Sequence, residues 1–312
     1  MNTIVALGPN PAWQKTLFFK EFHYGKVNRA EEMQTFPAGK GINFCRAAAY
    51  HGRMRGVLIQ FTGGENGDRI RRELEREGMP VRSIMTGGPT RCCTTCLDRA
   101  RQVMTEVIEP SFAATPVEVQ EMLAAFEEEL CRGAAGAALC GTLPTGTEPD
   151  LYPRAARLVR DAGIPLLLDS FRNTRDVFES GAEVWYKVNR EELREMTGEA
   201  DVESGLRQVF RFPAVKYAAI TDGPDNAYAS DGRTLAVYHL PPLKEVVNPI
   251  GCGDTANAVW MSEILSGNGS FEAFRSALAA ASANCLTAFP GSFSPAEADR
   301  IAAGISVELT TL

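Results

Sequence analysis

Short, continuous apolar runs alternate along this chain with longer segments of helical periodicity. Runs with no alternating polar face are typical of a parallel sheet that helices cover on both faces. At 312 residues the length favours one large domain. We therefore expect an α/β fold with a mainly parallel sheet. The runs that predict its strands are TIVALG, RGVLIQFTG, AAGAALCG, IPLLLDS, EVWYKVN and VKYAAITDG.

Two segments interrupt this alternation, at about residues 13–36 and 89–108. Both alternate with period two and contain no credible helix, so they predict strands of a small separate sheet. Each is inserted after a core element rather than added at a terminus. Two such insertions would meet over the carboxyl ends of the core strands, where open α/β sheets bind ligands. We expect them to form a lid.

Composition and charge exclude several classes of partner. A net charge of -7 without a long single-sign run argues against binding to nucleic acid or a membrane surface. No signal peptide or membrane span is evident, so we expect a cytoplasmic protein. The eight cysteines are then expected to be reduced thiols. Cys93 and Cys96 have the spacing of a zinc or redox pair, but no second pair completes a metal set, and packing between two short strands is favoured.

The stretch NPIGCGDTA suggests phosphoryl transfer. Gly251 and Gly253 allow the N–H groups from Cys252 to Asp254 to converge at a helix N-terminus, where they would attract an anion. Fixed donors there can stabilise the charge on a transferring phosphoryl group, and Asp254 could accept the proton of an attacking hydroxyl. A helix N-terminus favours the ionised carboxylate, so we expect a weak base. The motif alone fits a simple helix cap equally well.

A second glycine-rich turn, PAGKGIN, opens a helix at residues 39–43, and Lys40 adds a charge that suits a phosphate. Glycines before a helix are common, so this signal is weak by itself. The chain contains no GxxxxGK[ST] loop, and the turn after the first strand, LGPNPAW, lacks GxGxxG. A kinase with this sequence would need another scaffold.

Several motifs, taken in order, indicate such a scaffold because they resemble those of a known family. NPAW, GKVNRAEE, AGKGIN, GTLPTG, KVNREEL, ITDGP and NPIGCGDTANA occur in the order and at the separations of the PfkB, or ribokinase-like, carbohydrate kinases. The chain resembles the hexose-phosphate branch, which includes 1-phosphofructokinase and tagatose-6-phosphate kinase. The resemblance covers nearly all of residues 1–312 and implies a single kinase domain, with a three-layer α/β/α core and a small β-sheet lid.

The resemblance also implies an activity. It is the phosphorylation of a primary alcohol of fructose 1-phosphate, tagatose 6-phosphate or fructose 6-phosphate, with ATP and Mg²⁺ as cofactors. An exposed lid sheet has an edge and a face to protect, which together with the resemblance predicts a homodimer joined lid to lid.

Site roles follow from the resemblance residue by residue. Asp254 matches the catalytic base, and its anion hole matches Gly251, Cys252 and Gly253. Positions that face the sugar match Gly39, Gly41 and Asn43, and those that hold its phosphate match Lys40 and Arg91. The NxxE pattern that arranges magnesium and phosphate matches Asn189 and Glu192, for which a capped helix start is the alternative. Nucleotide-side positions match Lys187, Thr221, Gly223 and Asn284, although Asn284 could equally be a buried helix residue. Lys26 and Arg29 are weaker lid candidates.

Departures from the family pattern leave the acceptor open. Gln14 stands where the family usually has an aspartate that grips sugar hydroxyls, so it is expected to contact the sugar without a charge. Asn226 replaces a glycine near the nucleotide and is expected to adopt a left-handed turn. The alternatives are a kinase of an unphosphorylated sugar and a non-catalytic regulator that binds sugar phosphate or nucleotide. The intact turn before Asp254 favours an enzyme.

Overall fold

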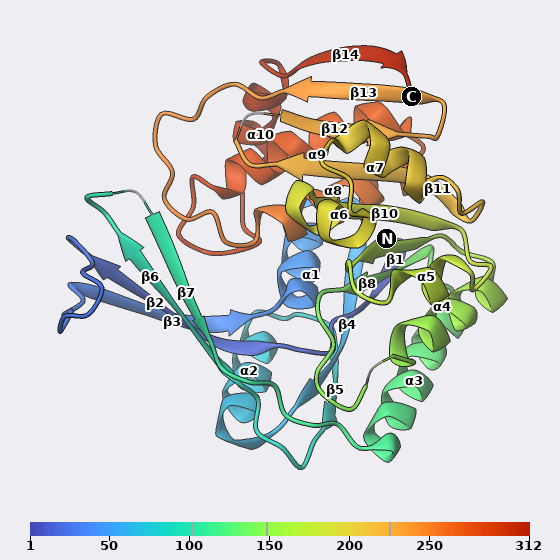
Figure 1. Cartoon of the computed structure of the whole chain (residues 1–312). Coiled ribbons are helices and arrows are strands. Elements are labelled where there is room, and N and C mark those ends of the chain that lie inside the picture. Colours follow the sequence, from blue (N-terminus) through green and yellow to red (C-terminus); the bar gives the residue numbers. More distant parts are fainter. Residues whose placement is uncertain (102, 148, 225) are drawn as a thin grey trace.

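A ten-stranded sheet forms the core of the computed structural model, which describes residues 1–101, 103–147, 149–224 and 226–312 (Figure 1). Strands from β11 to β5 run parallel, and β11 to β14 pair in antiparallel fashion. The expected mainly parallel α/β sheet is confirmed. Across the sheet the strands are β14 (Ser306–Thr311), β13 (Thr234–His239), β12 (Asn226–Ser230), β11 (Val215–Asp222), β10 (Val184–Asn189), β9 (Leu166–Asp169), β8 (Gly136–Cys140), β1 (Thr3–Leu7), β4 (Arg55–Thr62) and β5 (Val81–Met85).

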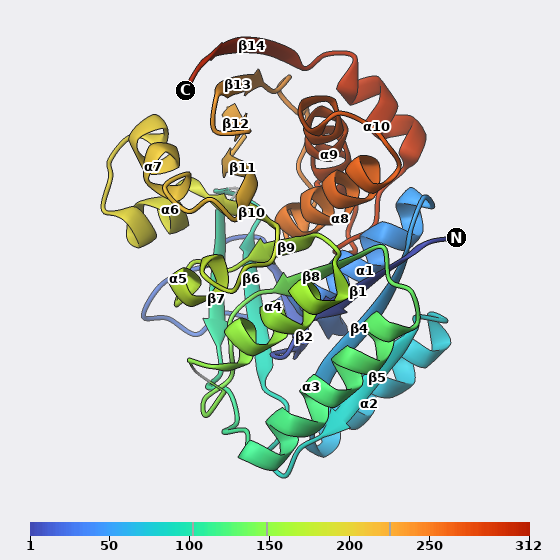
Figure 2. The same ribbon diagram turned by 90° about the vertical axis from the view of Figure 1, so that its right-hand side faces the viewer.

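Helices cover both faces of this sheet, and each face has its own apolar cluster (Figure 2). Ile4 and Ala6 of β1 face one cluster and Val5 and Leu7 face the other, which explains why this strand is apolar at all four positions after Thr3. The first face carries α1 (Lys40–His51), α2 (Gly64–Arg76), α8 (Cys252–Leu265), α9 (Ser270–Asn284) and α10 (Pro295–Ala302). The second carries α3 (Pro116–Cys131), α4 (Leu151–Ala162), α5 (Thr174–Phe178), α6 (Arg190–Thr197) and α7 (Val202–Val209).

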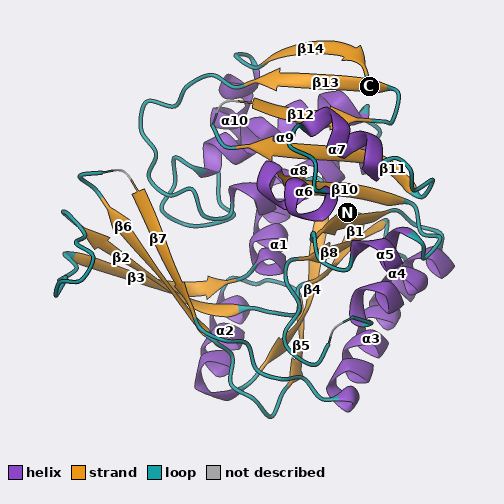
Figure 3. Ribbon diagram, viewed as in Figure 1, coloured by secondary structure: helices purple, strands orange, loops and turns teal. Residues whose placement is uncertain are grey.

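A separate four-stranded sheet projects from the core (Figures 1 and 3). Its order is β3-β2-β6-β7, and β2 and β6 pair in parallel although they come from the two distant insertions. The expected small sheet is therefore confirmed. Its strands are β2 (Ala12–Phe19), β3 (Glu32–Ala38), β6 (Cys92–Asp98) and β7 (Val103–Ile108).

The antiparallel extension of the core sheet was not expected from the sequence. Strands β12 and β13 are short and mix polar with apolar residues, and every residue of β14 is exposed, so none forms a continuous apolar run. Each pairs with the strand before it, β12 with β11, β13 with β12 and β14 with β13, so the extension grows outward from the edge of the parallel sheet. Within the described ranges, no helix is both long and apolar enough to cross a membrane.

Candidate active site

A cavity of about 460 Å³ lies at the carboxyl ends of the parallel strands. Polar side chains reach it from the ends of β9, β10 and β11, and the four-stranded sheet supplies its opposite wall. Those from the core are Asp169, Lys187, Asn189 and Thr221, and those from the β2 and β6–β7 segments are Gln14, Arg91 and Glu106. The cavity therefore combines the two sheets that the sequence predicts as separate units.

Two helices begin at this cavity, and each begins at a glycine. Gly39, the N-cap of α1, has φ 142°, and a Cβ there would lie 3.1 Å from Pro11 Cα. Gly251, the N-cap of α8, has φ 83°, and a Cβ there would lie 2.9 Å from the backbone nitrogen of Gly291. Both positions thus need glycine for conformation and for space. The two helix N-termini give the cavity unpaired N–H donors and partial positive charge.

Asn284 holds the glycine turn from behind. Its Nδ2 donates to the backbone oxygen of Ile250 at 3.0 Å, and its Oδ1 accepts from the backbone nitrogen of Gly291 at 2.7 Å and from Thr255 Oγ1 at 3.2 Å. The side chain is fully buried. It lines neither this cavity nor the adjoining cavity on the other side of the glycine turn. Asn284 is therefore a buried helix residue, which is one of the two alternatives that the sequence left open. Its side chain positions the turn before Asp254.

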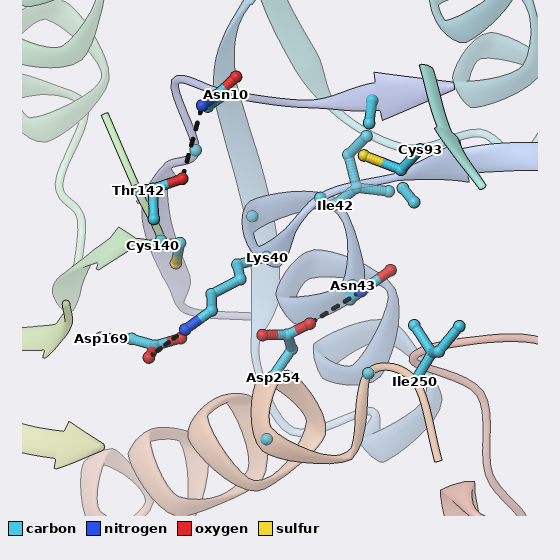
Figure 4. Close-up of a pocket in the computed structure, with 18 of the residues that line it drawn as sticks. Asn10, Lys40, Ile42, Asn43, Cys93, Cys140, Thr142, Asp169, Ile250 and Asp254 are labelled. Carbon is cyan, nitrogen blue, oxygen red and sulfur yellow. Dashed lines mark hydrogen bonds and ion pairs between the residues drawn. The ribbon is translucent and has the colours of Figure 1, made fainter. Parts of the chain in front are cut away.

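Asp254 lies in the first turn of α8, is 7% exposed, and accepts a 2.8 Å hydrogen bond from Asn43 Nδ2 (Figure 4). Burial is the largest influence and the charge of Asp169 the next, and together they raise the pKa of Asp254 to about 6. Lys40, Asn43 and Lys187 act in the opposite direction but do not offset them. The expectation of a weakly basic carboxylate is wrong, because it considered the helix terminus and not the desolvation.

Lys40 extends from the start of α1 toward the carboxylate of Asp169 (Figure 4). Its Nζ lies 2.9 Å from Asp169 Oδ1 and 3.8 Å from Glu192 Oε1. Burial alone would lower the pKa of Lys40, but the charges of Asp169, Glu192 and Asp254 together outweigh it and raise the pKa. The lysine is therefore a permanent cation beside Asp254. Sequence reasoning missed Asp169, whose signal is a carboxylate that ends a buried parallel strand.

Asn189 and Glu192 form a reciprocal cap at the start of α6. Glu192 Oε2 accepts from the Asn189 backbone nitrogen at 2.9 Å, and Asn189 Oδ1 accepts from the Glu192 backbone nitrogen at 2.8 Å. The capped helix start and a place at the cavity are thus both realised, because Glu192 Oε1 faces Lys40. Lys187 is 5% exposed and lies against the glycine turn, since a Cβ on Gly253 would be 3.0 Å from its Nζ.

The opposite end of the cavity carries polar groups with spare hydrogen-bonding capacity. Gln14 Nε2 donates to Thr95 Oγ1 at 2.7 Å, and Thr95 Oγ1 donates to Glu106 Oε1 at 3.4 Å, a chain that ends on a carboxylate. Among the described residues, Arg91 Nε and Asn10 Oδ1 are buried without a hydrogen-bond partner. Sequence reasoning missed Glu106 and Asn10, and their place on a cavity wall is the observation that identifies them.

A second cavity, of about 760 Å³, adjoins the first across the glycine turn. Its apolar wall comes from the loop after β13 and from α8 and α9, and it contains Gly223. Four residues line both cavities: Thr221, Pro249, Cys252 and Gly253. The turn is therefore the boundary between a polar and a largely apolar compartment.

Three other sequence candidates lie elsewhere. Asn226 is the first residue of β12, and its Oδ1 contacts His239 Nδ1 at 2.9 Å. The expected left-handed conformation of Asn226 is wrong, since Asn173 is the non-glycine residue that has a positive φ among those described. Lys26 and Arg29 are exposed in the loop between β2 and β3 and do not line the cavity.

Cys93 and Cys96 do not form a metal pair. They are separated by three positions on β6 and so point to opposite faces of the strand. Across the described residues, no group of three histidine, cysteine or acidic side chains is placed to hold a metal.

Comparison with known proteins gives a match to a sequence family and to several solved structures with the same fold. The model of the pfkB family carbohydrate kinases matches residues 10–296. Phosphofructokinase-2 from Escherichia coli, solved in complex with fructose-6-phosphate, aligns with a TM-score of 0.84 at 22% identity, covering 97% of this chain and 99% of that one. Its tetrameric inhibited form aligns with a TM-score of 0.85 at 21% identity over the same shares of both chains. A protein from Thermotoga maritima described as a possible 1-phosphofructokinase has a TM-score of 0.85 at 18% identity and 99% coverage of both chains.

Proposed function

We propose that this chain, which belongs to the pfkB family of carbohydrate kinases, transfers the terminal phosphoryl group of ATP to a primary hydroxyl of a ketohexose phosphate. The observation that carries the proposal is the position of Asp254. It lies beside the glycine turn that separates the polar cavity from the apolar one. A phosphoryl donor in one compartment and an alcohol in the other would meet at that turn.

The chemistry uses groups that are already fixed. Asp254 accepts the proton of the attacking hydroxyl, and a pKa of about 6 makes it ionised near neutral pH yet basic enough to act. The N–H groups at the start of α8, together with Lys40 and Lys187, stabilise negative charge that develops on the transferring group. Asn43 holds the carboxylate in place through its hydrogen bond to Oδ2.

The residues present fit ATP and Mg²⁺. The apolar second cavity suits a nucleoside, and its wall includes Leu240, Leu243 and Val246. Mg²⁺ usually takes one or two carboxylates and completes its shell with water and phosphate oxygens, and Asp169 and Glu192 offer such oxygens at the cavity. When bound, ATP supplies the phosphoryl group and Mg²⁺ neutralises its charge.

The acceptor end favours a phosphorylated sugar. Arg91 presents a guanidinium whose Nε has no partner in the described part of the chain, and a phosphate would satisfy it. Gln14 and Glu106 offer acceptors for sugar hydroxyls along the same wall. The phosphofructokinases among the similar structures support a hexose phosphate as the substrate class.

A coupled assay of ADP release tests the function directly. Purified protein with ATP and Mg²⁺ should turn over at least one of fructose 1-phosphate, fructose 6-phosphate and tagatose 6-phosphate, and should do so with higher kcat/KM than free fructose or tagatose. ADP release with free hexoses alone would replace the phosphorylated acceptor by an unphosphorylated one. If protein that still binds ATP releases no ADP with any sugar, the alternative of a non-catalytic regulator would replace the kinase.

The role of Arg91 gives a prediction of its own. Arg91→Met should lower kcat/KM for the phosphorylated acceptor about tenfold or more, because a charge-assisted contact is worth roughly 1.5–3 kcal/mol. Efficiency with a free hexose should change little. Arg76→Met is the matched control, since Arg76 is an exposed helix arginine paired with Glu73 and away from the cavity. Equal losses on both kinds of sugar in steady-state assays would contradict a phosphate contact.

The four-stranded sheet predicts a homodimer. Val107 is 58% exposed and Ile108 is 55% exposed on β7, the edge strand of that sheet, and as successive residues they point to its two faces. We expect a dimer by light scattering at micromolar concentration, and a monomer for Val107→Glu/Ile108→Glu. Val117→Glu, at a 67% exposed position on α3, should leave the dimer intact. A monomeric wild-type protein would rule the arrangement out.

A further inference from the structure

Two cysteine thiols that the proposed chemistry does not use meet beside the glycine turn. Cys252 is the first residue of α8 and Cys285 is the C-cap of α9, 33 positions later in the chain. Their Sγ atoms lie 2.9 Å apart. Both side chains are partly exposed and line the second cavity, so a small molecule can reach them.

We propose that Cys252 and Cys285 are a thiol–disulfide exchange site that reacts with a low-molecular-weight disulfide and, once oxidised, blocks phosphoryl transfer. The inference about activity rests on the proposed function, whereas the formation of the bond does not.

The backbone around both cysteines favours this pairing. The oxygen of Cys285 accepts hydrogen bonds from the backbone nitrogens of Val247 and Asn248, at 2.8 and 3.2 Å. This ties the end of α9 to the loop that leads into the turn. On the other side, Thr255 N donates to the oxygen of Gly251 at 2.8 Å and fixes the start of α8. A disulfide needs its sulfurs about 2.05 Å apart, so the pair requires only a small displacement.

The proposed thiol–disulfide exchange needs no reactant other than the small disulfide. The hydrogen bond from Cys252 lowers the pKa of Cys285, so Cys285 is the thiol that ionises and attacks one sulfur of the small disulfide RSSR. The RS–SR bond breaks, a mixed disulfide forms on Cys285 and one thiolate leaves. Cys252 then loses its proton and attacks Cys285 Sγ, which releases the second RS group. Two protein thiols are oxidised by two electrons, and RSSR is reduced to two RSH.

The bond would act on the anion hole because Cys252 belongs to it. Its backbone lies between Gly251 and Gly253, and Asn284 Nδ2 contacts its sulfur at 3.4 Å. Drawing the sulfur toward α9 shifts the N–H groups that must be aimed at the transferring phosphoryl group, and misaiming such donors costs orders of magnitude in rate. The same sulfurs line the compartment assigned to the nucleoside, so bound nucleotide should cover them.

The test treats the reduced, full-length protein with oxidised glutathione. Intact mass after alkylation should show two fewer alkylated cysteines than in the reduced protein and no glutathione adduct, and peptide mapping should link Cys252 to Cys285. ADP release should fall by at least about tenfold and should return with dithiothreitol. Bound ATP should slow the oxidation of the two cysteines. Cys131→Ser, which removes an exposed cysteine on α3, should behave like wild type.

The treatment should not lower the activity of Cys285→Ser relative to an untreated sample of the same variant, and Cys252→Ala provides a second variant that cannot form the bond. A Cys285→Ser protein that is inactivated like wild type, a disulfide between other cysteines, or full activity in the cross-linked protein would each overturn the proposal. If the bond forms but the reduced protein turns over no sugar, the failure belongs to the proposed function and the exchange site stands.

Discussion

Asp254→Asn should lower kcat by about a hundredfold to ten-thousandfold, the range typical of a lost general base, while ATP binding persists. Asparagine keeps the shape of the side chain, and its oxygen can still accept from Asn43, so the helix start should be unchanged. What it cannot do is take a proton at any accessible pH. Steady-state kinetics and nucleotide titration measure the two parts separately.

The same variant should be more stable than the wild type at pH 8. The folded-state pKa of about 6 for Asp254 lies above its ordinary value of 3.8, so the native state disfavours the ionised form. The stability contributed by the group is therefore full below pH 3.8 and is lost as the pH rises through 6. A neutral asparagine avoids that loss, which is about 3 kcal/mol for two pKa units, and Tm should rise by several degrees.

A matched control separates this effect from a general gain of stability. Asp68→Asn changes the same atoms on the exposed surface of α2, where Asp68 pairs with Arg71, and should alter neither kcat nor Tm appreciably. Asp254→Asn with wild-type turnover would end the assignment of the base. Asp254→Asn that is inactive and less stable would contradict the account of its raised pKa.

The sequence could predict the fold because the core strands report their burial directly. β1, β8 and β9 are buried at nearly every position, and such runs have few alternatives to a parallel sheet. β14 gave no such signal, since all its residues are exposed and its place depends on backbone pairing with β13. Pairing of that kind is decided by which edge is free after the core has formed.

Residues of the candidate site likewise differ in whether a local sequence pattern can identify them. Asp254 and its glycines are contiguous, so a local motif was enough to find them. Asp169 has only the general signal of a carboxylate that ends a buried strand, and Glu106 has no local signal that distinguishes it from an ordinary strand residue. Only the juxtaposition of distant elements identifies them. The pKa of Asp254 likewise depends on Asp169, 85 residues earlier.

Lys40 illustrates how a residue predicted from a motif can line the cavity and still need a different role. The sequence pairs it with Arg91 on the phosphate of the acceptor. Its ammonium instead lies 2.9 Å from Asp169 and among the charges that act on Asp254. We therefore propose that Lys40 serves the transferring phosphoryl group and that Arg91 alone serves the acceptor phosphate.

Lys40→Met should accordingly lower kcat about a hundredfold, and by a similar factor with phosphorylated and free sugars, because it removes a cation from the charge developing in transfer. It should also move the acidic limb of the pH–kcat profile upward from about pH 6. The positive charge of Lys40 lowers the pKa of Asp254, so its loss leaves burial and Asp169 less opposed and the base protonated at higher pH.

Lys216→Met, at an exposed position on β11, is the control and should move neither kcat nor the profile. Arg91→Met should leave the profile in place while it discriminates between the two kinds of sugar. The two readouts are independent, since one depends on the distance to Asp254 and the other on contact with the acceptor. A Lys40→Met enzyme that loses efficiency only with phosphorylated sugars, at an unchanged profile, would return Lys40 to the acceptor phosphate.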